Sequence, residues 1–134
     1  GILAPLALAS MRGHLDIVQK LLEAKADKDE VSDVGPERTT PLGLASSAGH
    51  VEVAALLLEA RADVDKVDEL IFTVKAKATP LALAAMNGQV DVVRLLLQSR
   101  ADKDAGLIRF GLRLSPLGLA AREGKTEAVQ LLLE

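Results

Sequence analysis

Hydrophobic and polar residues follow a pattern that recurs four times along the chain. The copies are anchored at Pro5, Pro41, Pro80 and Pro116, which are 36, 39 and 36 residues apart. In each copy Leu follows the proline, Leu and Ala stand three and four positions after it, Gly eight and an acidic residue eleven. Agreement at so many positions excludes coincidence, so we interpret the chain as a tandem repeat.

The pattern predicts two short helices in each copy. Thr40, Thr79 and Ser115 each precede a proline, which gives a hydroxyl N-cap followed by proline at the first helical position. The Leu- and Ala-rich first helix ends at the glycine, and the second helix places Leu15, Val18 and their equivalents on one face. Helices of about 8–10 residues do not persist alone in water, so the copies must stack as a solenoid.

An Asp-rich turn follows each second helix, and an extended segment then leads to the next proline. The turns read Ala-Asp-x-Asp at residues 26–29, 62–65 and 101–104. Asp favours turns because its side chain bonds its own nearby backbone.

The order T-P-L-x-L-A…G-H-x-E-V-V…L-L-L-E…A-D-x-D resembles the ankyrin repeat, over practically the whole chain. The resemblance implies helix–turn–helix units with projecting β-hairpin fingers, stacked into a curved array whose fingers and first helices form a concave, partner-binding surface. We therefore expect an all-α ankyrin-repeat solenoid. It would be a single array over residues 1–134, with repeats at 1–40, 41–79, 80–115 and 116–134, and we expect it to be an excerpt of a longer protein.

The chain departs from the family pattern in three ways. The family's His two residues after the proline is absent, so we expect closer and less polar packing there. The glycine before the Ala-Asp pair is also replaced, so either the turn is reshaped or a left-handed residue that is not glycine costs about 1 kcal/mol. The repeats exceed the usual period of about 33 residues, through finger insertions of three, six and three residues. The residues at the His position are Ala7, Gly43, Ala82 and Gly118, and those at the glycine position are Lys25, Arg61 and Arg100.

The inserted finger segments carry both aromatic residues of the chain. Insertions in repeat proteins lie on one face, often the binding face. In residues 107–114 apolar residues alternate with the others, which predicts one β-strand with an apolar face. Exposed apolar side chains beside arginine are typical of interaction sites. The finger residues expected to bind a partner are Ile71, Phe72, Arg109, Phe110 and Arg113.

Two further interpretations of these surfaces stay open. The fingers could pack on one another or fold back over the helices, instead of binding a partner or in addition to it. A second candidate surface is the end of each first helix, which varies among the copies and which the resemblance places toward the concave groove. Its residues, which could equally be solvated positions without a ligand, are Met11, Arg12, Ser47, Met86, Asn87 and Arg122.

Charge and composition narrow the function classes. The net charge of −3 and the lack of a basic cluster argue against nucleic acid as a partner. No apolar run approaches the roughly 18–20 residues that membrane insertion needs. The absence of cysteine excludes disulfides and thiolate chemistry and favours an intracellular, cytoplasmic location without proving it. The lysine and arginines before the Ala-Asp pairs predict surface ion pairs with the neighbouring Asp residues, or a charged stripe for a partner.

Catalysis, metal binding and cofactors are not expected. His14 and His50 are the only histidines, and their position holds Gln89 and Lys125 in the later copies. A position that accepts these three residue types serves a helix start. Stacked repeats would hold the two imidazoles about 10 Å apart, too far to share one metal.

The sequence therefore predicts a protein-interaction module and not an enzyme. The alternative is an architectural spacer within a longer ankyrin array, and a third possibility is a recruiting segment of an enzyme. The last helix ends in three leucines, so we expect marginal stability or self-association through uncapped ends. One added repeat at each end should then raise the melting temperature.

Overall fold

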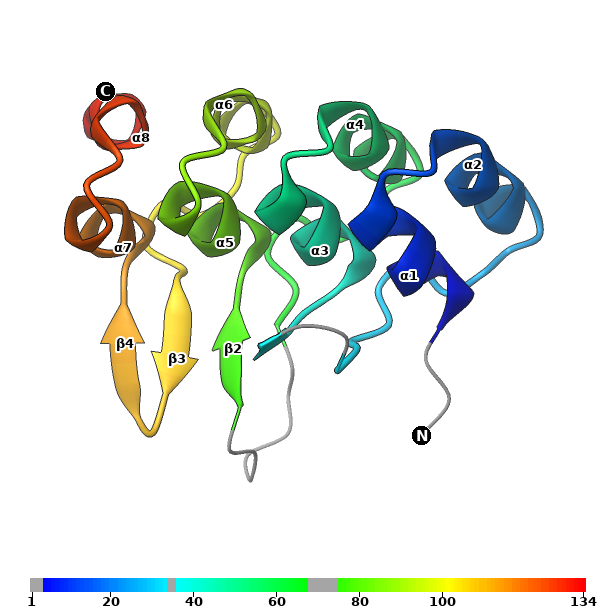
Figure 1. Ribbon diagram of the computed structural model, residues 1–134, viewed down its shortest axis with the longest axis horizontal. Coiled ribbons are helices and arrows are strands. Elements are labelled where there is room, and N and C mark those ends of the chain that lie inside the picture. The colour runs from blue at the N-terminus through cyan, green and yellow to red at the C-terminus, as the bar shows by residue number, and fades with distance from the viewer. Residues whose placement is uncertain (1–3, 34–35, 68–74) are drawn as a thin grey trace.

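Eight helices stack as four antiparallel pairs in the computed structural model, which describes residues 4–33, 36–67 and 75–134. The first helices of the pairs form one row and the second helices a parallel row above it (Figure 1). The pairs are α1 (Pro5–Arg12) with α2 (Leu15–Glu23), α3 (Pro41–Ala48) with α4 (Val51–Glu59), α5 (Pro80–Met86) with α6 (Val90–Gln98), and α7 (Pro116–Arg122) with α8 (Thr126–Leu133).

The predicted helix starts and stops are confirmed. The hydroxyl oxygens of Thr40, Thr79 and Ser115 accept hydrogen bonds from the backbone N–H three residues on, at 3.2, 3.1 and 3.0 Å. Gly13 and Gly49 end their helices with φ of 75° and 81°, the left-handed conformation that glycine adopts without strain. The repeated sequence motif therefore fixes the same local geometry in successive units.

One apolar core runs the length of the array between the two rows. Leucines one residue after the proline, such as Leu42 and Leu81, are fully buried, and so are Val53 and Val92 of the second helices. Because every helix has nine residues or fewer, its apolar face is covered by its partner helix together with the neighbouring pairs.

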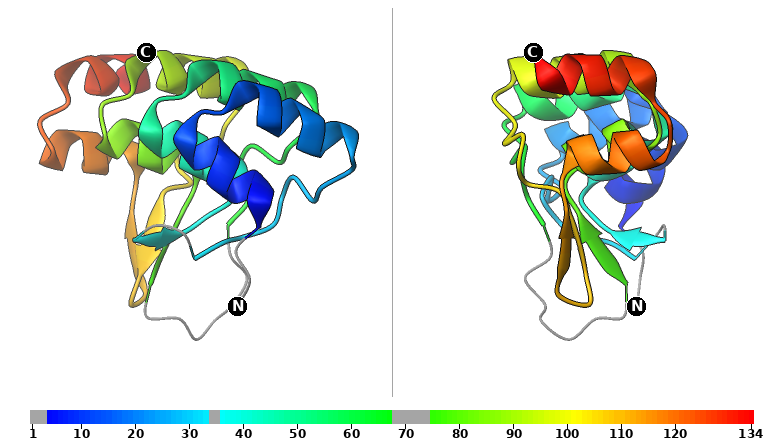
Figure 2. Two further views of the ribbon diagram at one scale, coloured as in Figure 1. Left: turned by 45° about the vertical axis from the view of Figure 1, so that its right-hand side comes forward. Right: turned by 90° about the vertical axis from the view of Figure 1, so that its left-hand side faces the viewer.

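A small four-stranded sheet projects from the side of the helical layer, so the expectation of an all-α fold is incomplete (Figure 2). The strand order is β1-β2-β3-β4, with β1 parallel to β2 and the other two pairings antiparallel. The strands are β1 (Glu37–Arg38), β2 (Ala76–Ala78), β3 (Leu107–Arg109) and β4 (Leu112–Leu114).

The β-strand pattern predicted over residues 107–114 is interrupted by a turn, so that it forms a hairpin of two strands. The chain reverses at Phe110 and Gly111, whose φ values of 51° and 77° are both positive. Positive φ at both central residues makes a two-residue turn that matches the twist of a hairpin. Leu107 then pairs with Leu114, and Ile108 with Arg113, across the two strands.

The predicted left-handed residues before the Ala-Asp pairs are confirmed. Lys25, Arg61 and Arg100 have φ of 63°, 69° and 65°. The turn geometry of the family is therefore kept although the glycine is missing, and each of these residues carries the backbone strain that glycine would avoid.

Replacing Arg61 by glycine should make the chain more stable, by up to about 1 kcal/mol, because the left-handed strain is relieved. Part of the gain is offset by the larger entropy that glycine loses on folding. Urea denaturation followed by circular dichroism measures the difference. As a control, Lys20→Gly within α2 should lower the stability by about 1 kcal/mol; a destabilised Arg61→Gly variant would show that the strain is absent.

The position of the family's histidine is tightly packed in the first three repeats, as predicted, and exposed at Gly118 in the fourth, and polar contacts cross the repeats beside it. Ala7 and Ala82 are fully buried. At Gly43 an added Cβ would collide with the hydroxyl of Thr39, which donates a hydrogen bond to the Ala78 carbonyl at 3.2 Å. Glycine at this position therefore makes room for a threonine that links two fingers.

Gly43→Ala should lower the free energy of unfolding by about 1–3 kcal/mol, since the new methyl group overpacks the contact with Thr39. In Gly118→Ala the nearest atom is Ser115 Oγ at 3.3 Å, so this control should lose little stability. Adding Thr39→Ala to Gly43→Ala should recover only part of the loss, because it removes the hydroxyl and methyl groups but leaves Thr39 Cβ 2.8 Å from the added Cβ and breaks the hydrogen bond to the Ala78 carbonyl. Thermal and urea denaturation of the four proteins test this, and equal losses for Gly43→Ala and Gly118→Ala would contradict it.

Candidate functional site

A groove lies between the sheet and the ends of α5 and α7, with a volume of about 440 Å³. We call it the finger groove. Four of the predicted partner-binding residues line it together: Met86 and Arg122 from the helix ends, and Arg109 and Phe110 from the third finger. The remaining lining residues come from the sheet and are Glu37, Ala76, Leu107, Leu112 and Leu114.

The other predicted site residues do not line the finger groove. Arg113 lies on the opposite face of the hairpin, where it lines a second hollow of about 310 Å³. Ser47 and Asn87 bond each other, with the Asn87 amide donating to Ser47 Oγ at 3.1 Å. Met11 and Arg12 end α1, at the far end of the array. Ile71 and Phe72 lie outside the described residues.

Phe110 is poorly explained by folding alone. Its side chain is 75 % exposed, so it contributes little to the core. Its φ of 51° is strained for a bulky aromatic residue, where Asn would fit the turn better. Strain combined with exposure is a feature of functional positions.

The charges of the finger groove are one carboxylate and two guanidinium groups. The guanidinium carbon of Arg109 lies 5.2 Å from the centre of the Phe110 ring, within the range of a cation–π contact. Burial raises the pKa of Glu37 above its ordinary value, while a backbone hydrogen bond and the charge of Arg109 oppose the rise. Arg122 Nε contacts the Glu123 carboxylate at 3.1 Å on the surface. The groove is thus apolar in the middle, and its rim carries charges of both signs, with Arg122 paired to Glu123.

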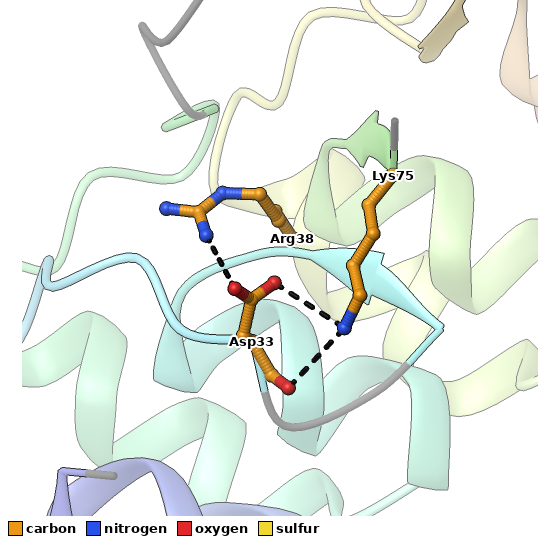
Figure 3. Close-up of polar contacts among 3 residues, drawn as sticks. All are labelled: Asp33, Arg38 and Lys75. Carbon is orange, nitrogen blue, oxygen red and sulfur yellow. Dashed lines mark hydrogen bonds and ion pairs between the residues drawn. The ribbon is translucent and has the colours of Figure 1, made fainter. Parts of the chain in front are cut away.

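An ionic cluster at Asp33 aligns the strands beneath the groove. Its carboxylate lies 2.8 Å from Arg38 of β1 and 3.3 Å from Lys75, the residue before β2 (Figure 3). Lys75 also reaches the Asp33 carbonyl at 3.5 Å. Because these side chains are partly exposed, each pair contributes at most about 1 kcal/mol. Their effect is to hold the first two fingers in register.

The Asp-rich turns form a hydrogen-bond relay, in which the bonds within each turn were predicted and the bonds between repeats were not. Asp29 accepts the backbone N–H of Asp63 at 2.8 Å, and Asp65 accepts that of Asp102 at 3.0 Å. Within each turn the first Asp accepts the N–H of the second, at 2.9–3.0 Å. The carboxylates thus connect successive repeats through the backbone.

The expected ion pairs of the neighbouring basic residues are not formed. Within the described part of the chain, Lys25, Arg61 and Arg100 contact no carboxylate at ion-pair distance. Their left-handed backbone and exposed side chains point to a role in the turn itself. The spacing of alternating Asp residues was the available signal, because it matches side-chain-to-backbone turns as well as it matches charge pairing.

The position shared by His50 and Gln89 also connects repeats. His50 Nε2 lies 3.0 Å from the Met11 carbonyl, and Gln89 Nε2 donates to the Ser47 carbonyl at 3.1 Å. Since a carbonyl only accepts, the His50 contact requires the tautomer protonated at Nε2. The helix-start interpretation missed this role, although the pairing of His with Gln as alternative donors was a signal for it.

Asp65 should make stability depend on pH in a defined direction. Burial is the main cause that raises its pKa from 3.8, with the charges of Asp102 and Asp63 adding to it and the bond from the Asp102 N–H opposing it. The unfolded chain therefore ionises Asp65 at lower pH than the folded chain does. The contribution of Asp65 is full below pH 3.8 and declines as the pH rises through the raised pKa.

The measurement is the unfolding free energy of the wild type minus that of Asp65→Asn, in urea at pH values from about 3 to 7, around the ordinary aspartate pKa. We expect this difference to fall as the pH rises. A difference that stays flat, or that grows with pH, would contradict the raised pKa.

No three His, Asp or Glu side chains in the described ranges converge closely enough to hold a metal ion. None of the helices described has the length and apolar character that crossing a bilayer requires.

A family model described as ankyrin repeats (3 copies) matches residues 6–106 and again residues 65–134. Together with the stacked helix pairs, this match shows that the chain belongs to the ankyrin-repeat family. Ankyrin repeats generally mediate protein–protein interactions and are typically scaffolds without enzymatic activity. A comparison with curated proteins found no match.

Proposed function

We propose that the chain binds a partner protein through the finger groove and the third finger. The observation that carries this proposal is Phe110, which is strained and 75 % exposed at the rim of an apolar groove. Leu112 beside it is 71 % exposed. A partner that covered both side chains would remove their apolar surface from water, which is favourable.

The composition of the groove supports a protein ligand. Aromatic and arginine side chains are the commonest anchors of protein interfaces, and Met adapts to irregular apolar surfaces. Here Phe110, Arg109, Arg122 and Met86 come together from two helices and one hairpin. An architectural spacer would bury Phe110 against its own fingers, so its exposure favours binding over the purely architectural alternative.

A comparison of three proteins tests the proposal: the wild type, Phe110→Asn and Leu133→Ser. Asn fits the left-handed turn, so Phe110→Asn should melt no lower than the wild type while losing the aromatic anchor. Leu133, on α8 and outside the groove, is 68 % exposed, which makes Leu133→Ser the matched control. Each protein would be used for affinity capture from native cell extract, followed by mass spectrometry.

We expect partners that the wild type and Leu133→Ser retain and that Phe110→Asn loses. Site-specific cross-linking from position 112 should then join the same partners. If all three proteins capture the same partners, the finger groove is not the binding surface. If none captures a partner, the architectural alternative is favoured.

A further inference from the structure

Asn87 is the only asparagine of the chain, and Gly88 follows it directly. An asparagine before glycine can lose its amide without an enzyme, because the backbone nitrogen of the glycine attacks the side-chain Cγ. Glycine favours this step, since it has no Cβ to hinder the approach and its backbone rotates freely. The sequence therefore places one intrinsically reactive amide in the array, at the end of α5, where Asn87 is exposed.

The reaction balances with water as its only co-reactant. The Gly88 backbone nitrogen gives up its proton and forms a bond to Asn87 Cγ. The bond between Cγ and Nδ2 breaks, and Nδ2 takes up a proton and leaves as ammonia. Water then opens the resulting succinimide ring at either of its two carbonyl groups. One opening gives aspartate, and the other gives isoaspartate, in which the main chain runs through the former side chain.

In the folded chain three features hold the reacting atoms apart. The Gly88 N–H donates to the Ala85 carbonyl at 3.2 Å, so the attacking nitrogen is occupied. The ψ of Asn87 is 1°, which eclipses the Gly88 nitrogen with the Asn87 nitrogen, whereas ring closure requires it to eclipse Cβ. The Asn87 amide also donates to the Leu83 carbonyl at 2.8 Å and to Ser47 Oγ at 3.1 Å. The reaction therefore requires the end of α5 to open first.

Ser47 makes this opening depend on the contact between two repeats. It belongs to α3, which lies beside α5, so its bond to Asn87 crosses the interface between the second and third repeats (Figure 1). Next to it, Gln89 donates to the Ser47 carbonyl at 3.1 Å. Helix ends open at a lower cost in free energy than the whole domain does. The polar contacts of Ser47 thus determine how often Asn87 reaches the reactive geometry.

The products cannot replace the contacts of the amide. A carboxylate only accepts hydrogen bonds, so the bond to the Leu83 carbonyl is lost and two oxygens face each other. The new charge lies at the C-terminus of α5, where the helix dipole disfavours an anion. Isoaspartate also lengthens the main chain before Gly88, which displaces the Gly88 N–H from the Ala85 carbonyl. Each product weakens the end of α5 beside Met86, which lines the finger groove.

We propose that Asn87 is a site of spontaneous deamidation, restrained by its contact with Ser47, and that its conversion loosens the interface between the second and third repeats. The reacting groups are the Gly88 backbone nitrogen and the Asn87 side-chain amide. The inference does not depend on the proposed partner, because every group that reacts belongs to the chain itself.

The test follows the chain of residues 1–134 and an unfolded peptide of residues 83–92 during incubation at mildly alkaline pH, where the backbone N–H is deprotonated more readily. Mass spectrometry after proteolysis gives the fraction of Asn87 converted, and labelling by an isoaspartate methyltransferase measures the isoaspartate product. We expect Asn87 to react in the folded chain, but more slowly than in the peptide by about tenfold or more, because the end of α5 must open.

Ser47→Ala removes the contact from the preceding repeat, so it should raise the rate in the folded chain about two- to tenfold, the factor that one net hydrogen bond implies. Hydrogen exchange of the Gly88 amide should become faster by the same factor, because it needs the same opening. Ser99→Ala, at the C-cap of α6, is the matched control and should leave both rates unchanged. Asn87→Asp reproduces one product and should melt below the wild type.

Several outcomes would overturn the proposal. If Asn87 stays intact in the folded chain during an incubation many times as long as the peptide needs, it is not a modification site. If chain and peptide react at equal rates, the fold does not restrain the amide. Equal rates in Ser47→Ala, Ser99→Ala and the wild type would exclude Ser47 as the restraint. The comparison of chain with peptide decides the first two points even if Ser47→Ala fails to fold.

Discussion

The stacking of one helix pair on the next is the interaction on which the rest of the structure depends. Every helix has between seven and nine residues, which is too short to be stable alone in water. Residues such as Leu42, Leu81 and Val92 become fully buried only because neighbouring pairs cover them. Free energy is therefore gained at the interfaces between repeats, as expected for a quasi-one-dimensional protein. The fingers depend on this stack in turn, since β1, β2 and β4 each lead into a first helix.

Apolar stacking is not directional, so the register between repeats needs polar contacts. His50 and Gln89 bond a carbonyl of the preceding first helix, and Asp29 and Asp65 bond a backbone N–H of the following turn. These contacts lie at opposite ends of the helix pair, so a sliding or tilting of one repeat breaks at least one set. A hydrogen bond that is satisfied only in one arrangement selects that arrangement even when its net contribution to stability is small. The polar contacts therefore determine how each repeat is placed on the next, and the finger groove is built on this arrangement.

The helices were predictable because each repeat carries its own start and stop signals, and the internal copies confirm one another. Caps at Thr40 and Thr79 follow from residue type and position alone, whereas the left-handed Arg61 was expected from the glycine that the family has at its position. The hairpin of the third finger was not predictable, because alternating apolar residues are compatible with one long strand as well as with a hairpin. Phe110-Gly111 lacks the Asn or Asp that normally identifies such a turn. The joining of Met86 and Arg122 with Phe110 also depended on the path of the finger, which the repeat pattern does not specify.

The finger groove lies in the part of the fold where changes of length and sequence reduce stability the least. Lengthening a loop adds closure entropy that grows only with the logarithm of its length. The stacking residues lie in the helices, so a finger can be extended, or its tip replaced, without disturbing the core that the helices share. The third finger uses this freedom in an unusual way, because it places an aromatic residue where the turn itself is better served by asparagine. A side chain that the fold neither buries nor needs for its turn is best explained by something outside the fold, and the finger groove that Phe110 lines is where that contact is geometrically available.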